Sequence, residues 1–68
     1  MTLYLKLPTE QGPLFNKIKA ILNMFPGENP VVVYFADTKI RRGSRCLPSE
    51  SMLNELTDLL GRENVVLK

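Results

Sequence analysis

The order in which hydrophobic periodicity changes along this 68-residue chain constrains its fold more than any other feature. Residues 3–7 alternate, with Leu3, Leu5 and Leu7 on one face, which is typical of a half-buried strand. Residues 31–35, VVVYF, are strongly β-prone and apolar on both faces, which predicts a central strand. Residues 39–46 alternate more weakly and predict a strand antiparallel to it. Residues 64–67 predict a short closing strand.

Two other segments repeat apolar residues every three or four positions, which predicts amphipathic helices. These segments are residues 13–25 and residues 50–60. Pro26-Gly27 is expected to end the first helix, because proline cannot continue it and glycine tolerates a left-handed turn. Ser49 is a good N-cap for the second helix, and Gly61 is the residue expected after it.

The resulting order, β-α-β-β-α-β, predicts an α+β fold. The economical arrangement is a ferredoxin-like sandwich, with a four-stranded, mainly antiparallel sheet and two helices on one face. A sheet with one strand moved to another position is an alternative. The length predicts one domain, residues 1–68. Such small domains bury only about 60% of their unfolded surface, so the core needs nearly all the large apolar residues.

The composition leaves little room for chemistry at a catalytic or metal site. The chain has no histidine and one cysteine, Cys46, so neither a zinc site nor an internal disulfide is expected. Its carboxylates are scattered over turns and helix faces, and no glycine-rich phosphate loop is present. The sequence therefore predicts no catalytic residue, no metal and no cofactor.

Cys46 is interpreted as a small hydrophobe at a strand end. The alternative is a reactive thiol whose pKa is lowered by Arg42 and Arg45. No apolar run approaches the roughly 20 residues of a membrane span, and no signal peptide is evident. We therefore expect a cytoplasmic protein that does not contact a membrane.

Positive charge is concentrated in the predicted hairpin, although the net charge is only +2. Four of the nine basic residues fall within seven positions: Lys39, Arg41, Arg42 and Arg45. Such a cluster could grip phosphates or an acidic partner surface. The alternative is a solvated edge strand whose charges block edge-to-edge pairing. On a strand, Lys39, Arg41 and Arg45 share one face and Arg42 points away, unless Gly43 forms a bulge or the hairpin bend.

Aromatic residues that could stack on bases are few. Tyr4 and Tyr34 are the candidates, on strands that would be central in the sheet. RNA-recognition domains use such sheet positions for stacking aromatics. Their characteristic pattern of glycine and aromatic residues is absent, which argues against that family.

Two longer segments resemble a known family. The segment Leu22–Val31, LNMFPGENPV, is similar to a "PG-x-x-PV" region near the C-terminus of bacterial DNA polymerase III alpha subunits. The ending Pro48–Lys68 is similar to that family's final helix and strand, "LLG-x-x-NVVLK", and Leu3–Leu7 is similar to the strand before them. The resemblance runs nearly end to end. It departs at Gly43–Leu47, where family members often carry an aromatic-Val-Asn segment.

The resemblance implies a small domain that follows the OB-fold of the polymerase and acts as a noncatalytic docking module. It also implies the clamp loader tau subunit as a partner, with the polymerase aspartates lying outside this chain. We predict replisome protein–protein docking, with the basic hairpin as the partner surface. The alternatives are a single-stranded nucleic-acid-binding module, including single-stranded DNA, and a homodimer that binds a small regulatory molecule.

Overall fold

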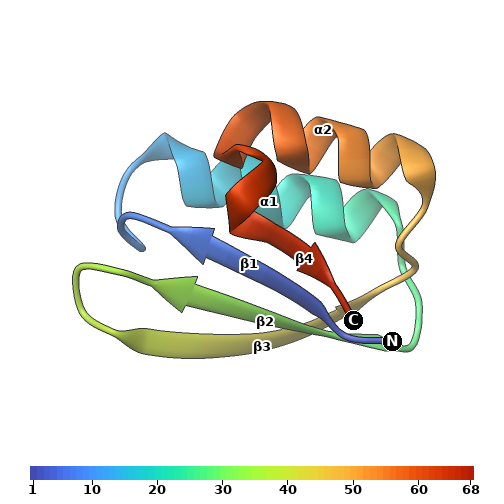
Figure 1. The fold of residues 1–68 in the computed structure, drawn as a ribbon, viewed down its shortest axis with the longest axis horizontal. Helices are drawn as coiled ribbons and strands as arrows, with labels where there is room; N and C mark the ends of the chain where they lie inside the picture. The colour runs from blue at the N-terminus through green and yellow to red at the C-terminus, as the bar shows by residue number, and fades with distance from the viewer.

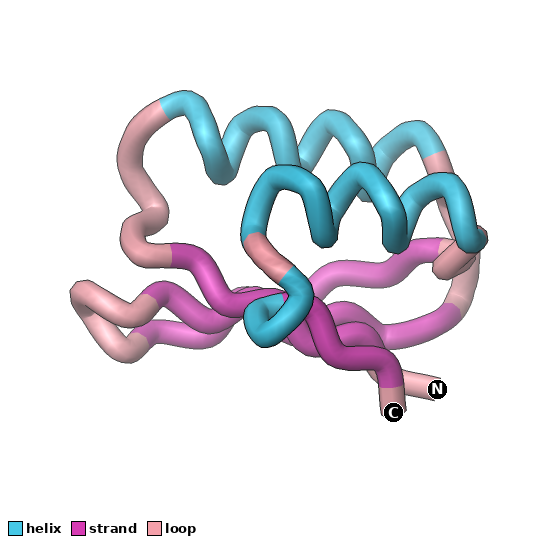
Figure 2. The backbone as a smooth tube through the Cα atoms, turned by 45° about the horizontal axis from the view of Figure 1, so that its top comes forward, coloured by secondary structure: helices cyan, strands magenta, loops and turns pink.

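The computed structural model describes residues 1–68 and has two layers, a four-stranded sheet and two helices that cover one of its faces (Figures 1 and 2). The elements are β1 Leu3–Leu7, α1 Pro13–Met24, β2 Asn29–Phe35, β3 Ile40–Cys46, α2 Glu50–Leu60, the 3-10 turn η1 Arg62–Asn64 and β4 Val65–Leu67. The predicted α+β class, the order of the elements and the placement of both helices on one face are confirmed.

The strand order is β3-β2-β1-β4. β1 and β2 are parallel, whereas the β2–β3 and β1–β4 pairs are antiparallel, so the sheet is mixed and mainly antiparallel. β2 lies directly beside β1, whereas a split β-α-β arrangement would place another strand between them. The strand order is therefore that of the alternative in which one strand occupies another position in the sheet. This pairing places the two most apolar strands at the centre and leaves the charged β3 at the edge.

The core lies between the sheet and the helices. Alternate side chains of β1 and β2 point into it, and α1 and α2 supply the facing layer. The buried residues are Leu3, Leu5, Leu7, Ile18, Ile21, Leu22, Val31, Val33, Phe35, Cys46, Met52 and Leu56. Phe35 also packs edge-on against Phe15, with ring centroids 4.9 Å apart. The period-2 and helical patterns of the sequence are thus both used to fill one core.

Gly27 lies in the turn after α1, where it packs against the backbone at the end of β3, and its conformation differs from the predicted one. Its φ angle is not positive, so the left-handed turn predicted there is wrong. A Cβ at Gly27 would lie 2.7 Å from the Leu47 amide nitrogen and 2.8 Å from the Cys46 carbonyl group. The Leu47 amide donates to the Phe25 carbonyl over 2.8 Å. Glycine is therefore required because the turn after α1 packs against the backbone that follows β3.

The ends of α2 match the sequence prediction. The Ser49 hydroxyl accepts a hydrogen bond from the Met52 amide over 3.2 Å, and Gly61 has a φ of 91°. The Asn64 side chain donates to the Leu60 carbonyl over 2.7 Å, which satisfies a helix-end acceptor. The "LLG-x-x-N" segment therefore ends α2 and leads the chain into β4.

The hairpin between β2 and β3 turns at residues 36–39. Asp37 and Thr38 lie in this turn, as predicted, and the Asp37 carboxylate accepts from the Thr38 amide over 2.7 Å. Lys39 has a φ of 59° and precedes the strand, so its predicted place in β3 is wrong. Gly43 forms neither a bulge nor the bend, because the pairing register continues through it opposite Val32.

Candidate functional site

The four basic residues predicted as one surface are divided among three places. The register sets Arg41 opposite Tyr34, and Arg45 opposite Pro30, on the face of the sheet that carries no helix. Arg42 is opposite buried Val33 and lies on the helix side. Lys39 lies in the turn, so it does not extend the row of Arg41 and Arg45.

Two of these basic residues are ion-paired within the chain. Arg42 donates from Nε to the Glu10 carboxylate over 2.6 Å, and this hydrogen bond, with the charge of Glu10, raises the pKa of Arg42 above its ordinary value. Arg45 lies 3.5 Å from the Glu28 carboxylate, and both side chains are exposed. Lys39 and Arg41 make no ion pair, so they hold the positive charge of the hairpin most available to a ligand.

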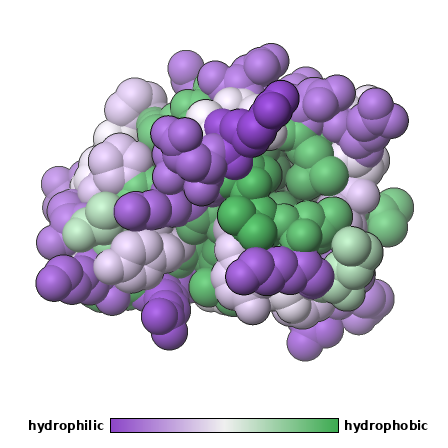
Figure 3. Space-filling model, in the orientation of Figure 1, coloured by the Kyte–Doolittle hydropathy of each residue, from purple (hydrophilic) through white to green (hydrophobic).

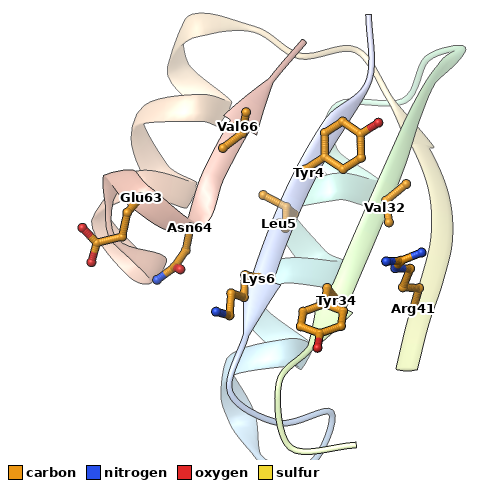
Figure 4. Close-up of a pocket in the computed structure, with 9 residues that line it drawn as sticks. All are labelled: Tyr4, Leu5, Lys6, Val32, Tyr34, Arg41, Glu63, Asn64 and Val66. Carbon is orange, nitrogen blue, oxygen red and sulfur yellow. The ribbon is translucent and has the colours of Figure 1, made fainter. Parts of the chain in front are cut away.

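The open face of the sheet carries a shallow groove with a volume of about 620 Å³ (Figure 4). The groove crosses the strands and reaches η1, and its lining combines aromatic, aliphatic and charged side chains. The lining residues are Tyr4, Leu5, Lys6, Val32, Tyr34, Arg41, Glu63, Asn64 and Val66. No helix lies over this face (Figure 2). Figure 3, drawn in the orientation of Figure 1, shows hydrophobic surface near the middle of that side with hydrophilic side chains around it.

The strand register arranges the groove side chains in two rows. One row is mostly apolar, because Tyr4 is opposite Val66 on one side and Val32 on the other, and Gly43 follows Val32. A Cβ at Gly43 would meet nothing within 4 Å, so the end of this row is open space. Tyr4 is 43% exposed despite its central strand.

The second row is cationic. Tyr34 is opposite Lys6 on β1 and Arg41 on β3, so a positive side chain flanks the ring on each side (Figure 4). Lys68 reaches the other row, with its Nζ 5.8 Å from the centre of the Tyr4 ring, within the range of a cation–π contact. Both tyrosines of the chain are therefore on one face and near cationic groups.

A smaller hollow of about 220 Å³ lies on the helix side, between α1 and β3. It is lined by Phe15, Lys19, Leu22, Asn23, Val33, Arg42, Gly43 and Ser44. Lys19 already covers the Phe15 ring, with Nζ 4.9 Å from its centre. The hollow therefore offers less free surface than the groove on the open face.

Cys46 does not have the surroundings of a reactive thiol. It is fully buried at the end of β3, and burial raises its pKa. The alternative in which Arg42 and Arg45 lower its pKa is wrong, because both guanidinium groups are engaged with carboxylates at the surface. The interpretation of Cys46 as a small buried hydrophobe is confirmed.

No cluster of three or more metal-ligating side chains is present, and neither helix has the length and apolar character to cross a membrane. Comparison of the chain with protein-family models, with curated proteins and with solved structures finds no match.

The sequence predicted the candidate residues of the groove only in part. Tyr4 and Tyr34 were identified as candidate stacking residues, but Lys6 and Val66 were not. Lys6 and Val66 line the groove because β1 lies between β2 and β4 in the sheet. This strand order cannot be read from the pattern within any one strand. Alternation within residues 3–7 assigns Tyr4 and Lys6 to the face opposite the three leucines, but it could not place Arg41 beside Tyr34.

Proposed function

We propose that this chain is a noncatalytic docking domain that takes an extended segment of a protein partner against the free edge of β3. The observation that carries the proposal is the edge itself. β3 is seven residues long, it is the outermost strand, and Ile40 to Arg45 are all exposed. Such an edge presents unpaired backbone donors and acceptors that an added strand can satisfy.

The charge of the β3 edge argues for a selective partner. If two chains paired antiparallel through this edge, the arginines of one β3 would lie among those of the other, for example Arg41 opposite Arg45 when the pairing is centred on Gly43, and like charges on neighbouring strands oppose that pairing. A partner strand that carries Asp or Glu reverses the sign of this interaction. The edge therefore discourages self-association and favours an acidic extended segment.

The resemblance to the C-terminal region of the bacterial DNA polymerase III alpha subunit supports a setting for this docking. Within that setting the partner is the clamp loader tau subunit, and the compartment is the cytoplasm. The "PG-x-x-PV" and "LLG-x-x-NVV" segments that carry the resemblance serve loop packing and helix termination. These segments therefore support a shared architecture. The residues that contact the partner are proposed to lie on the edge strand β3.

Binding of the purified tau subunit to the chain, followed by calorimetry, tests the proposal. We expect the double variant R42E/R45E to weaken binding at least about tenfold, because two charges would then repel an acidic strand. The matched control is K17E/K19E, which makes the same charge change on exposed positions of α1. Equal affinity of R42E/R45E and the wild type, or no binding of tau by the wild type, would contradict the proposal.

A further inference from the structure

The open face of the sheet has features that strand addition at the β3 edge does not use. The two tyrosines, the two valines of the apolar row and Lys6 all point away from the core. Among the residues that line the groove, only Arg41 also lies on β3. We infer that this face is a binding site for single-stranded nucleic acid, with bases stacked on Tyr4 and Tyr34 and phosphates held by Lys6 and Arg41. This inference stands apart from the proposed docking at the edge.

The spacing of the tyrosines suits unstacked bases. Tyr4 is opposite Val32, and Tyr34 is opposite Lys6, so the rings are diagonal neighbours on adjacent parallel strands. Neighbouring strands lie about 4.8 Å apart and two residues rise about 6.6 Å along a parallel strand, so such diagonal positions are separated by roughly 8 Å. This separation exceeds the stacking distance within a helix, so one strand would place a base on each ring only if the bases are splayed apart. Single-stranded nucleic acid allows this and a duplex does not.

The charge around the tyrosines is complementary to a phosphate backbone. Lys6 and Arg41 flank Tyr34, and Lys68 lies over one side of Tyr4. Lys6 and Arg41 make no ion pair within the chain, so a phosphate would not have to displace a carboxylate from either. Glu63 is the one acidic residue of the lining, at the far end beyond β4, where its carboxylate is drawn pointing away from the groove (Figure 4).

The apolar row provides the sequence-tolerant part of the surface. Val66 and Val32 flank Tyr4, and Gly43 leaves the space beyond Val32 empty. Aromatic and aliphatic surface of this kind contacts the flat face of any base, whereas hydrogen-bond readout needs several polar groups, and the Tyr4 hydroxyl is the one polar side-chain group of this row. The site should therefore prefer flexible, weakly stacked strands such as oligothymidylate and oligouridylate over a fixed base sequence.

An acidic protein segment fits the charges but leaves the rings without a matching partner, because carboxylates do not stack. A second copy of the chain would bring another Lys6 and another Arg41 to the interface, and the lining of the groove holds a single acidic residue, Glu63, to offset them. The face thus favours a polyanion that also carries flat rings. The rings and cations of the groove serve DNA and RNA alike, and the test compares the two.

The chain is suited to a label-free test, because it contains no tryptophan and its two tyrosines are both in the groove. Tyrosine fluorescence therefore reports this face alone. The full chain is titrated with oligothymidylate and oligouridylate of about eight nucleotides, a length within the site sizes of single-strand-binding folds. Parallel titrations use inorganic polyphosphate, a polyglutamate peptide and a DNA duplex.

We expect both single strands, or one of them, to quench the fluorescence, and polyphosphate, polyglutamate and the duplex to leave it nearly unchanged. Two phosphate contacts predict about a sevenfold loss of affinity between about 50 and 200 mM salt. Y34S should weaken binding at least about fivefold, and Y34F, which keeps the ring, should restore it. K6S/R41S should weaken binding and reduce the salt dependence, and K17S/K19S on α1 should do neither.

Several results would overturn the inference. One is the absence of quenching by either single strand at low salt. Another is equal quenching by polyglutamate, which would assign the face to an acidic protein segment. A third is a dimer by sedimentation that Y34S dissociates, together with no oligonucleotide binding, which would make the face an interface between copies. A Y34L variant that binds as well as Y34F would replace stacking by simple apolar contact and contradict the role of the rings.

Discussion

The central strands β1 and β2 have one face covered by the helices and one open face, and adjacent residues alternate between the two. Phe35 and Tyr34 are neighbours in β2, yet Phe35 is fully buried against Phe15 while Tyr34 lines an open groove between two cations. β1 repeats the arrangement with Leu5 and Tyr4. The covered face is a continuous hydrophobic core that includes Phe35, and the open face carries both tyrosines without any helix to cover them. The side chains that stabilise the fold and those available for binding therefore alternate along the same strands.

The largest expected difference between the faces is in stability. Phe35→Ala should cost about 3–5 kcal/mol, because it removes a buried ring and leaves a cavity. A chain of this length has a free energy of unfolding of only about 3–10 kcal/mol, so the variant should be largely unfolded. Tyr34→Ala should cost less than about 1 kcal/mol. Urea unfolding followed by circular dichroism measures both, and similar losses from the two substitutions would show that the faces are not distinct.

A second comparison sets two glycines against each other. Gly27→Ala should lower the free energy of unfolding by about 1–3 kcal/mol, because its Cβ would meet the backbone of Cys46 and Leu47. Gly43→Ala should raise it by about 0.5–1 kcal/mol, because its Cβ meets nothing and alanine loses less entropy on folding. Thermal melts of the two variants test this. A neutral Gly27→Ala would mean that the loops at that end are not tightly packed.

The turn that presents the basic edge stores a small strain. Lys39 has a positive φ, which costs a residue with a Cβ about 1–2 kcal/mol, whereas glycine adopts it freely. Lys39→Gly relieves this strain, and the greater conformational entropy that glycine loses on folding offsets part of the gain. The free energy of unfolding should therefore rise by about 0.5–1 kcal/mol. The same melts, with Thr38→Gly as the control at a neighbouring position, check this. A destabilised Lys39→Gly would argue for a side-chain role of Lys39 in the turn.

Cys46 gives the smallest effect, and one that depends on pH. Because burial raises its pKa in the folded chain, the neutral thiol favours folding, and this contribution is complete below the ordinary thiol pKa. As pH rises past that value, the unfolded chain loses its proton first and stability falls. The free energy of unfolding should therefore decline more steeply with alkaline pH in the wild type than in Cys46→Ala. Parallel slopes in urea titrations would contradict the burial of the thiol.

Local patterns were sufficient to predict most of the fold. The bounds of β1 and α2 follow from alternation, the Ser49 cap and Gly61, all of which are decided by residues close in sequence. Strand order could not be predicted this way, because pairing β2 beside β1 depends on contacts between distant segments. The start of β3 was misplaced by one residue, because alternation is weak in a strand whose side chains are nearly all exposed.

The candidate sites were predictable to a lesser extent, for the same reason. The clustering of basic residues in sequence suggested one surface, but alternation sends Arg41 and Arg42 to opposite faces, and Glu10, thirty-two positions away from Arg42, pairs with it. The two tyrosines were visible in the sequence as candidates for stacking. Their position on a shared open face, with Lys6 and Arg41 beside Tyr34, became apparent only from the sheet register.

The most direct test of the binding role of the open face is to map chemical shifts residue by residue. Amide spectra of the labelled chain are recorded with increasing oligothymidylate. We predict the largest shifts at Tyr4, Lys6, Tyr34 and Arg41, with little change along the outer side of α2. Shifts concentrated on the helices, or no shifts at a ligand excess that saturates the fluorescence change, would contradict the assignment of the open face as a binding surface.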